Sequence, residues 1–143
     1  MPFRTAELRI ATQGFGDIRD LTGEATRLVA DAHLQDGLLL LFVPGSTAGL
    51  TTIEYESGAI ADLKAAIERL APQTLDYAHD ARWGDGNGFA HVRAALLGPS
   101  LAVPVADGAL ALGTWQQIIL CDFDNRPRER RLVAHLQGDF ASA

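Results

Sequence analysis

Two histidines flank a glycine-rich turn in the segment DYAHDARWGDGNGFAHVRAALLG, which runs from Asp76 to Gly98. His79 lies in polar sequence before the turn, and His91 follows within the first turn of an expected short helix. A loop and an adjoining helical turn can converge on one point. Neutral imidazoles together with the Asp85 carboxylate would suit a zinc-type ion, with water completing its coordination shell. Imidazole also titrates near neutral pH, so both histidines are candidate acid–base catalysts.

The same segment has simpler interpretations. The spacing of its histidines matches no strong metal-binding signature, and DGNG lacks the later glutamate of a calcium loop. No lysine follows the glycines, so the turn is not a Walker-type phosphate loop. Asn87 would then serve only as the N-cap of a short helix that ends at Gly98. Capping explains the amide and the glycines but not the histidines, which therefore carry the active-site prediction.

A second candidate is the segment FVPGSTAGLTTIEYE, where an expected strand runs into a Pro-Gly turn. Backbone N–H groups and the hydroxyls of Ser46 and Thr47 would form a concave anion-binding surface there. Glu54, further along the segment, is a candidate to orient the histidines or to help hold an ion. Turns of this composition are also common connectors, and Ser46 has no nearby histidine–aspartate pair that would make it a nucleophile.

A third candidate is the segment GTWQQIILCDFDNRPRERR, from Gly113 to Arg131. Gln116 is a candidate hydrogen-bond partner for a substrate. Arginines recur at every second position near the end of the segment, so they share one face of a strand. Such a row is usually solvated, yet Arg128 or Arg130 can bind a phosphate through two N–H donors. Cys121 is expected to be a small buried hydrophobe rather than a nucleophile.

Composition limits the class of protein and its partners. With 143 residues, 48% of them hydrophobic, the chain suits one globular domain over residues 1–143. A net charge of −6 argues against a nucleic-acid partner. The longest apolar run, Leu38–Pro44, is far shorter than the ~20 residues that cross a bilayer. A single cysteine and the lack of a signal-peptide pattern predict a cytoplasmic protein with no membrane partner.

Periodicity predicts the elements that must position these residues. Alternation over Phe3–Thr12 indicates a half-buried strand, and a helix with Asp17 as its N-cap is expected next. The apolar run Gly37–Val43 is typical of a strand buried on both faces. Ser57 is expected to cap a second long helix that stops near Pro72, and strand-like sequence follows the short third helix. Helices early and paired strands late predict an α+β fold with largely antiparallel sheets, two longer helices and one short helix.

Taken together, the three segments resemble the YjbQ-like family, whose members carry the label secondary thiamine-phosphate synthase. The resemblance lies in STAGLTTIEYE, in the pair His79–Asp80 followed by DGNG, His91 and LLGPS, and in GALALGTWQQIILCDFDNRPRERR. It extends from about Leu41 to Gly138 in the order and spacing of the family. The resemblance implies a small α+β unit with β-sandwich-like sheets and a tendency to form homotrimers.

The activity that the resemblance implies is a weak thiamine-phosphate synthase, a transferase that joins a pyrimidine diphosphate to a thiazole phosphate with loss of pyrophosphate. A diphosphate leaving group needs cationic and N–H stabilisation, which Arg128, Arg130 and the Ser46–Thr47 turn would give, together with a divalent ion such as zinc or magnesium. The expected catalytic residues are His91, His79, Asp85 and Glu54, with His79 and His91 as metal ligands. The expected substrate-binding residues are Ser46, Thr47, Asn87, Gln116 and Arg128.

One departure from the family pattern affects the metal prediction. Many relatives carry a histidine where this chain has Gly45 or Ser46. With that residue three histidines would meet, whereas only His79 and His91 remain here. Either the metal has been lost, or Asp85, Glu54 or water replaces the missing ligand.

A second hypothesis belongs to a different functional class. The protein would be a non-catalytic oligomer that binds a small molecule or an anion in the same pocket without turnover. Stabilisation by phosphates or thiamine precursors, without product formation, would favour this hypothesis over an enzyme.

Overall fold

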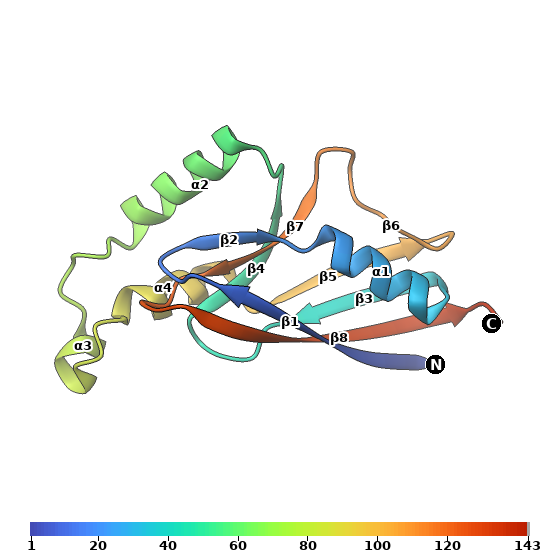
Figure 1. The fold of residues 1–143 in the computed structure, drawn as a ribbon, viewed down its shortest axis with the longest axis horizontal. Coiled ribbons are helices and arrows are strands. Elements are labelled where there is room, and N and C mark those ends of the chain that lie inside the picture. Colours follow the sequence, from blue (N-terminus) through green and yellow to red (C-terminus); the bar gives the residue numbers. More distant parts are fainter. Residues whose placement is uncertain (143) are drawn as a thin grey trace.

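The computed structural model describes residues 1–142, which form eight strands and four helices (Figure 1). The strands are β1 (Phe3–Thr12), β2 (Asp17–Asp20), β3 (Leu34–Phe42), β4 (Ala48–Ile53), β5 (Ser100–Ala106), β6 (Ala109–Leu110), β7 (Gln117–Asp122) and β8 (Arg128–Phe140). The helices are α1 (Thr22–Ala32), α2 (Ser57–Leu70), α3 (Ala78–Trp83) and α4 (Gly88–Leu97).

The strands form two antiparallel sheets. The larger sheet has the order β1-β8-β3-β5-β6, and the smaller sheet has the order β2-β7-β4. This arrangement confirms the α+β prediction with antiparallel sheets. The sequence predicted only one short helix, α4, and the structure adds a second one, α3, in the polar segment that contains His79.

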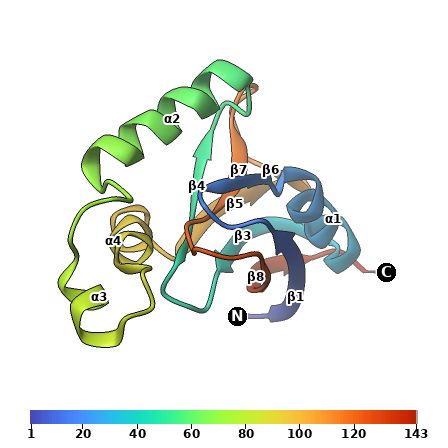
Figure 2. The same cartoon turned by 60° about the vertical axis from the view of Figure 1, so that its left-hand side comes forward.

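The smaller sheet lies between the larger sheet and the helices α2 and α4 (Figure 2). Its central strand, β7, is covered on both faces. Ile118 and Leu120 pack with α1 and the larger sheet, whereas Ile119 and Cys121 pack with Phe89 on α4. Each strand turns successive side chains to opposite faces, so a single strand supplies both apolar layers.

Cys121 shows how completely β7 is enclosed. Its side chain is fully buried, and burial raises the pKa of its thiol to about 12. A thiol that stays protonated at neutral pH is a poor nucleophile. The prediction that Cys121 acts as a small hydrophobe is thereby supported by its surroundings.

The prediction that Gly37–Val43 is buried on both faces is wrong. The run lies mostly in β3, where Leu39 and Leu41 are fully buried, whereas Leu38 and Phe42 are 37% and 41% exposed. The sheet is antiparallel, and α1 and the smaller sheet cover only one of its faces. An antiparallel sheet of this kind can leave its second face to solvent or to a partner.

Two helices begin at residues other than those predicted. Asp17 does not cap a helix, because it opens the short strand β2, whose backbone pairs with β7. Helix α1 starts only at Thr22, whose backbone N–H donates to the carboxylate of Asp20 at 2.9 Å. The N-cap of α2 is Glu56 rather than Ser57, and its carboxylate accepts hydrogen bonds from two backbone N–H groups of the first turn.

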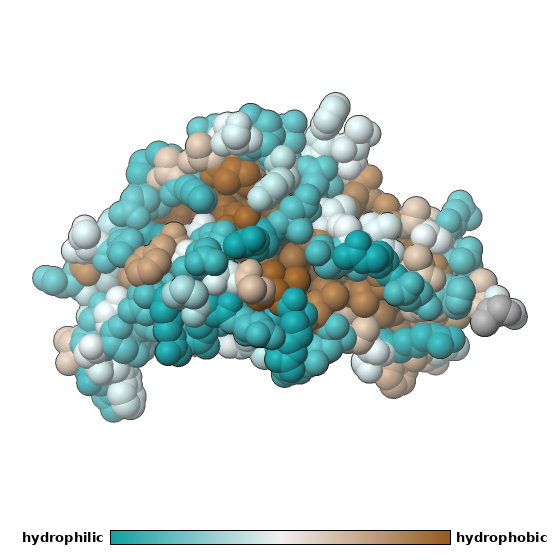
Figure 3. Space-filling view, viewed as in Figure 1, coloured by the Kyte–Doolittle hydropathy of each residue, from teal (hydrophilic) through white to brown (hydrophobic). Residues whose placement is uncertain are grey.

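Helix α2 packs loosely on the outside of the molecule. None of its residues is fully buried, and apolar residues remain visible beneath it (Figure 3). Within residues 1–142, none of the helices combines the length and the apolar character needed to cross a membrane.

Helix α4 is held very close to β4. The backbone N–H of Leu50 donates to the carbonyl of Gly98 at 2.9 Å, just after the helix ends. Gly49 makes this approach possible, since a Cβ atom at that position would lie 2.9 Å from the same Gly98 oxygen and 2.9 Å from the Leu97 side chain. This contact sets the height of α4, and therefore of His91, above the sheet.

Replacing Gly49 with alanine should destabilise the protein by about 1–3 kcal/mol, because the added methyl group overpacks the contact between β4 and α4. The free energy of unfolding from denaturant titration measures the effect. Gly23→Ala is the matched control, since a Cβ there would meet only the Arg27 side chain at 3.8 Å and alanine favours a helix. Equal stabilities of the two variants would contradict the close-packing explanation.

Candidate functional site

A surface hollow of about 320 Å³ lies where three connections meet, namely the β3–β4 loop, the α3–α4 region and the turn between β7 and β8. We call it the polar pocket. Its lining is Gly45, Ser46, Thr47, His79, Trp83, Asp85, Asn87, His91, Asp124, Arg128 and Arg130.

The polar pocket brings together eight of the residues that the sequence singled out, from all three candidate segments: Ser46, Thr47, His79, Asp85, Asn87, His91, Arg128 and Arg130. Glu54 and Gln116 do not line it. Glu54 follows the end of β4 whereas Thr47 precedes its start, and a six-residue strand spans roughly 20 Å. Gln116 instead shapes the loop before β7, donating to the Thr52 hydroxyl at 3.0 Å.

The two predicted histidines are in contact. The ring centroids of His79 and His91 lie 4.3 Å apart, with the ring planes inclined by 39°. The Nδ1 atom of His79 is 3.3 Å from Asp85 Oδ1 and 3.7 Å from Asp80 Oδ1. That nitrogen is buried and has no partner with hydrogen-bond geometry among the described residues. Helix α3 therefore places an imidazole nitrogen close to two carboxylates without a hydrogen bond to either of them.

The donor set at this point fits a divalent cation. Among residues 1–142, ligand atoms of His79, Asp80 and Asp85 all lie within 4.8 Å of one another. An unpartnered imidazole nitrogen beside two carboxylates offers the nitrogen and oxygen ligands that zinc accepts. His91 is outside this cluster of ligand atoms, although its ring lies against the ring of His79.

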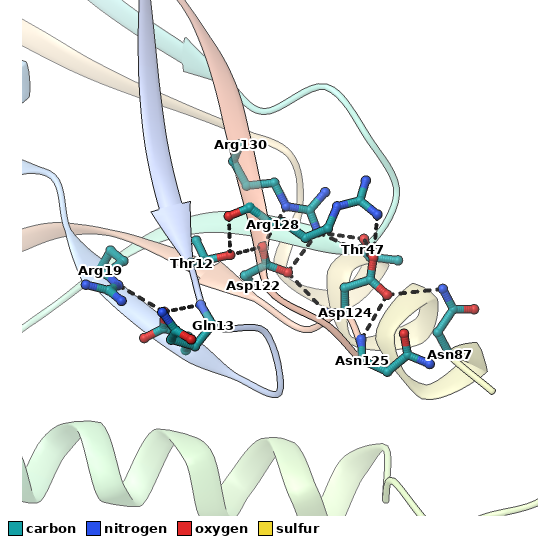
Figure 4. Close-up of polar contacts among 11 residues, drawn as sticks. Thr12, Gln13, Arg19, Thr47, Asn87, Asp122, Asp124, Asn125, Arg128 and Arg130 are labelled. Carbon is teal, nitrogen blue, oxygen red and sulfur yellow. Dashed lines mark hydrogen bonds and ion pairs between the residues drawn. The ribbon is translucent and has the colours of Figure 1, made fainter. Parts of the chain in front are cut away.

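Behind the pocket, a buried ion pair links the two sheets (Figure 4). Arg130 on β8 donates from Nε and Nη2 to the two carboxylate oxygens of Asp122 on β7, at 2.7 and 2.8 Å. The hydroxyl of Thr12 on β1 donates to the same carboxylate at 2.5 Å. Both charged side chains are almost completely buried, with 4% exposure for Arg130 and 0% for Asp122.

Burial alone would raise the pKa of Asp122, because it disfavours the charged carboxylate. Hydrogen bonds from Arg130 and Thr12 and the charge of Arg130 outweigh this effect, so the pKa lies below its ordinary value. The pKa of Asp124 is also lowered: burial raises it, but hydrogen bonds from Asn125 and Asn87 and the charge of Arg128 lower it by more. Both aspartates are therefore ionised at neutral pH.

Asp124 connects the ion pair to the pocket (Figure 4). Its carboxylate accepts from Arg128 Nη1 at 3.1 Å, from the Thr47 hydroxyl at 3.2 Å and from Asn87 Nδ2 at 3.3 Å. Arg130 Nη2 also donates to the Thr47 hydroxyl at 2.7 Å. One carboxylate thus fixes side chains from all three segments that build the pocket.

Asn87 occupies the predicted N-cap position of α4, but its side chain makes no capping hydrogen bond. The Asp80 carboxylate caps the helix from α3 instead, accepting from the Gly88 N–H at 2.8 Å. The Asn87 amide is turned towards Asp124, which leaves its Oδ1 atom buried and without a hydrogen-bond partner in residues 1–142. The side chain of Asn87 therefore lines the polar pocket and does not cap α4.

The sequence identifies Arg130 as a candidate phosphate ligand but indicates no role for Asp80, Trp83, Asp122 or Asp124. A signal for the ion pair was present in the pattern D-x-D at the end of a buried strand followed by R-x-R at the start of the next. A charge on the core-facing side of a buried strand requires a charged partner. No comparable signal marks Trp83, whose side chain is 67% exposed at the end of α3.

Fold and pocket together define a class of protein: a small α+β domain whose two antiparallel sheets hold a histidine–carboxylate cluster beside paired arginines. The family model described as UPF0047 protein YjbQ-like matches residues 6–139. The chain belongs to this YjbQ-like family, as the resemblance indicated.

Known relatives support the assignment over nearly the whole chain. A UPF0047 protein of Archaeoglobus fulgidus is 41% identical over 127 residues, which cover 89% of this chain and 96% of that protein. The UPF0047 protein YugU of Bacillus subtilis is 33% identical, with 92% and 97% covered. The crystal structure of a YbjQ-like protein of unknown function from Sulfolobus solfataricus is 28% identical, with a TM-score of 0.91 over 96% of this chain and 99% of that one.

Replacing Asp122 with asparagine should destabilise the protein at neutral pH by about 3–5 kcal/mol, because Arg130 would stay buried without its counter-charge. The lowered pKa means that the contribution of Asp122 to stability is present above the ordinary carboxyl pKa of ~4 and is lost as the pH falls through the folded-state pKa. The unfolding free energy of the variant should therefore depend less on pH in the acid range. Urea unfolding between about pH 7 and about pH 2 measures both effects.

The control is Asp31→Asn, which removes one charge from an exposed position on α1. It should leave both the stability and its pH dependence close to those of the wild type. Indistinguishable pH profiles for Asp122→Asn and the wild type would show that the ion pair does not stabilise the folded state.

Proposed function

We propose that the polar pocket binds a phosphorylated small molecule and transfers its organic group, with a diphosphate as the leaving group. The observation that carries this proposal is the lining of a single pocket, which joins the pair His79 and His91 to the pair Arg128 and Arg130. Histidines supply acid–base groups, and arginines bind the anionic oxygens of phosphates.

Each arginine retains donors for an anion. Arg128 uses Nη1 on Asp124, and its side chain is 33% exposed. Arg130 uses Nε and Nη2 on Asp122 and Thr47, whereas its Nη1 atom lies next to Gly45, where a Cβ atom would be 3.3 Å away. A guanidinium group has five N–H donors, so neither is exhausted by these contacts. Their carboxylate partners hold both groups in place before a ligand arrives.

The charges of the pocket favour a metal–phosphate ligand over a bare phosphate. Asp85 and Asp124 line the pocket and balance the charges of Arg128 and Arg130. A diphosphate would therefore meet little net positive charge. His79, Asp80 and Asp85 would hold a divalent cation, zinc or magnesium, which when bound supplies the positive charge that stabilises a departing diphosphate.

The family label suggests one specific reaction, the synthesis of thiamine phosphate. The ring nitrogen of a thiazole phosphate attacks the methylene carbon of a pyrimidine diphosphate, so that a carbon–nitrogen bond forms. The carbon–oxygen bond to the diphosphate breaks, and its electron pair leaves with pyrophosphate. His91 would donate a proton to the leaving oxygen, and Arg128 would bind its negative charge.

We also propose that the protein works as a cytoplasmic homotrimer, assembled through the uncovered face of the larger sheet. On this face the apolar side chains of Phe3, Leu38, Leu40, Phe42 and Val133 form a patch around His135, next to the polar side chains of Thr5, Glu7 and Arg131. Phe3 stacks on His135 with ring centroids 5.1 Å apart, and neither helix nor strand of residues 1–142 covers them. An apolar patch of this kind marks an interaction surface.

Replacing Arg128 with alanine should weaken pyrophosphate binding about tenfold to a hundredfold, the effect of losing one charge-assisted hydrogen bond. Calorimetric titration with pyrophosphate and magnesium measures the change. In the synthase assay with both thiamine precursors, His91→Ala should reduce turnover about a hundredfold or more while pyrophosphate still binds.

Arg126→Ala is the matched control, because it removes the same charge from an exposed residue outside the pocket. It should preserve both binding and turnover. Equal losses in Arg126→Ala and Arg128→Ala would contradict a specific anion site. Pyrophosphate binding by the wild type without product from any precursor pair would favour the non-catalytic binding protein.

Replacing Phe42 with aspartate should convert the trimer into monomers, because three buried carboxylates would lack partners at the interface. Light scattering coupled to size-exclusion chromatography measures the mass in solution. Leu75→Asp is the control, since Leu75 is 57% exposed in the loop before α3. A monomeric wild type, or a trimer that survives the Phe42 change, would refute this interface.

A further inference from the structure

A second hollow adjoins the polar pocket and differs from it in chemistry. Its volume is about 210 Å³, and it shares Gly45, Ser46 and His91 with the polar pocket. The rest of its lining has only small apolar side chains: Ala48, Ala94, Ala95 and Pro99. We call it the alanine groove. It runs between the beginning of β4 and the C-terminal half of α4.

The two hollows meet at Gly45, which lines both and has no side chain. Its φ of +121° belongs to a backbone region that favours glycine. A Cβ atom at this position would point to Arg130 Nη1, at 3.3 Å. Gly45, Ser46 and His91 form the boundary between the groove and the pocket, and Arg130 Nη1 lies close to it on the pocket side.

We propose that the alanine groove holds an apolar ring of the substrate while the phosphate end of the same molecule occupies the polar pocket. This inference rests on the function proposed above and adds to it a separate subsite for the ring, which selects organic phosphates with one small ring over inorganic phosphate. A cavity of about 150 Å³ is enough for benzene, so a hollow of this size accepts one substituted ring. His91 would then lie at the junction between the ring and the phosphate, where the bond between them breaks.

Two other apolar surfaces compete for this role. A groove between α2 and α4 has a volume of about 180 Å³, but it shares no residue with the polar pocket. The exposed indole of Trp83 does border the polar pocket, yet it does not line the alanine groove. Among these described surfaces, only the alanine groove shares His91 with the polar pocket. We therefore assign the ring of the substrate to the alanine groove.

Ala95 offers a direct test, because it is an exposed helical position that lines the groove and not the polar pocket. Ala95→Phe would fill the groove. The probes are inorganic phosphate and phenyl phosphate, which carry similar charge and differ by one ring, titrated calorimetrically with magnesium present. The wild type should bind phenyl phosphate at least about tenfold more tightly than inorganic phosphate. Ala95→Phe should abolish this preference while its affinity for inorganic phosphate changes less than about twofold.

Val92→Phe is the matched control, since Val92 is exposed on α4 and lines neither hollow. It should keep the preference for the ring. Ala95→Leu provides a smaller plug, which should reduce the preference in part. Retention of the full preference in Ala95→Phe, or its loss in Trp83→Ala instead, would overturn this inference. Equal wild-type affinities for the two probes would refute the ring subsite but not the proposed function. Binding of neither probe would refute both the ring subsite and the proposed function.

Discussion

Arg130 reaches from β8 in the larger sheet to Asp122 in β7 of the smaller sheet, so a salt bridge inside the protein joins the two layers. Neither charge is stable there alone, because the interior solvates an isolated ion poorly. The geometry compensates for the lost water: two N–H groups meet two oxygens, and Thr12 satisfies the same carboxylate from a third strand. Correct packing of both sheets is thus a condition for burying the pair.

The ion pair of Arg130 and Asp122 holds the side chains of the polar pocket in place through a chain of hydrogen bonds. Arg130 also donates to Thr47, and Thr47 donates to Asp124, which accepts from Arg128 and Asn87. Groups that face the solvent are therefore fixed by groups that do not. A site held in this way loses little orientational freedom when a ligand binds, which is the condition for strong electrostatic stabilisation of charge.

The sequence contained enough information for the antiparallel α+β fold, the burial of Cys121 and the meeting of His79 with His91 and Asp85, since each depends on local periodicity or spacing. It could not place Glu54 relative to the pocket. Glu54 follows β4 and Thr47 precedes it, so the strand carries the two residues to opposite ends. Residues that act only through long-range partners were also missed. Asp124 is an example, since Thr47, which donates to its carboxylate, lies 77 residues away in the sequence.

The enclosed thiol of Cys121 is a built-in probe of local opening in the protein. It is the single cysteine of the chain, and it lies in the layer between β7 and the helix that carries His91. A thiol-specific reagent reaches it only when that layer separates, so the labelling rate reports how often the wall of the pocket opens. Breathing of the site can therefore be timed on the unmodified chain, with no engineered probe.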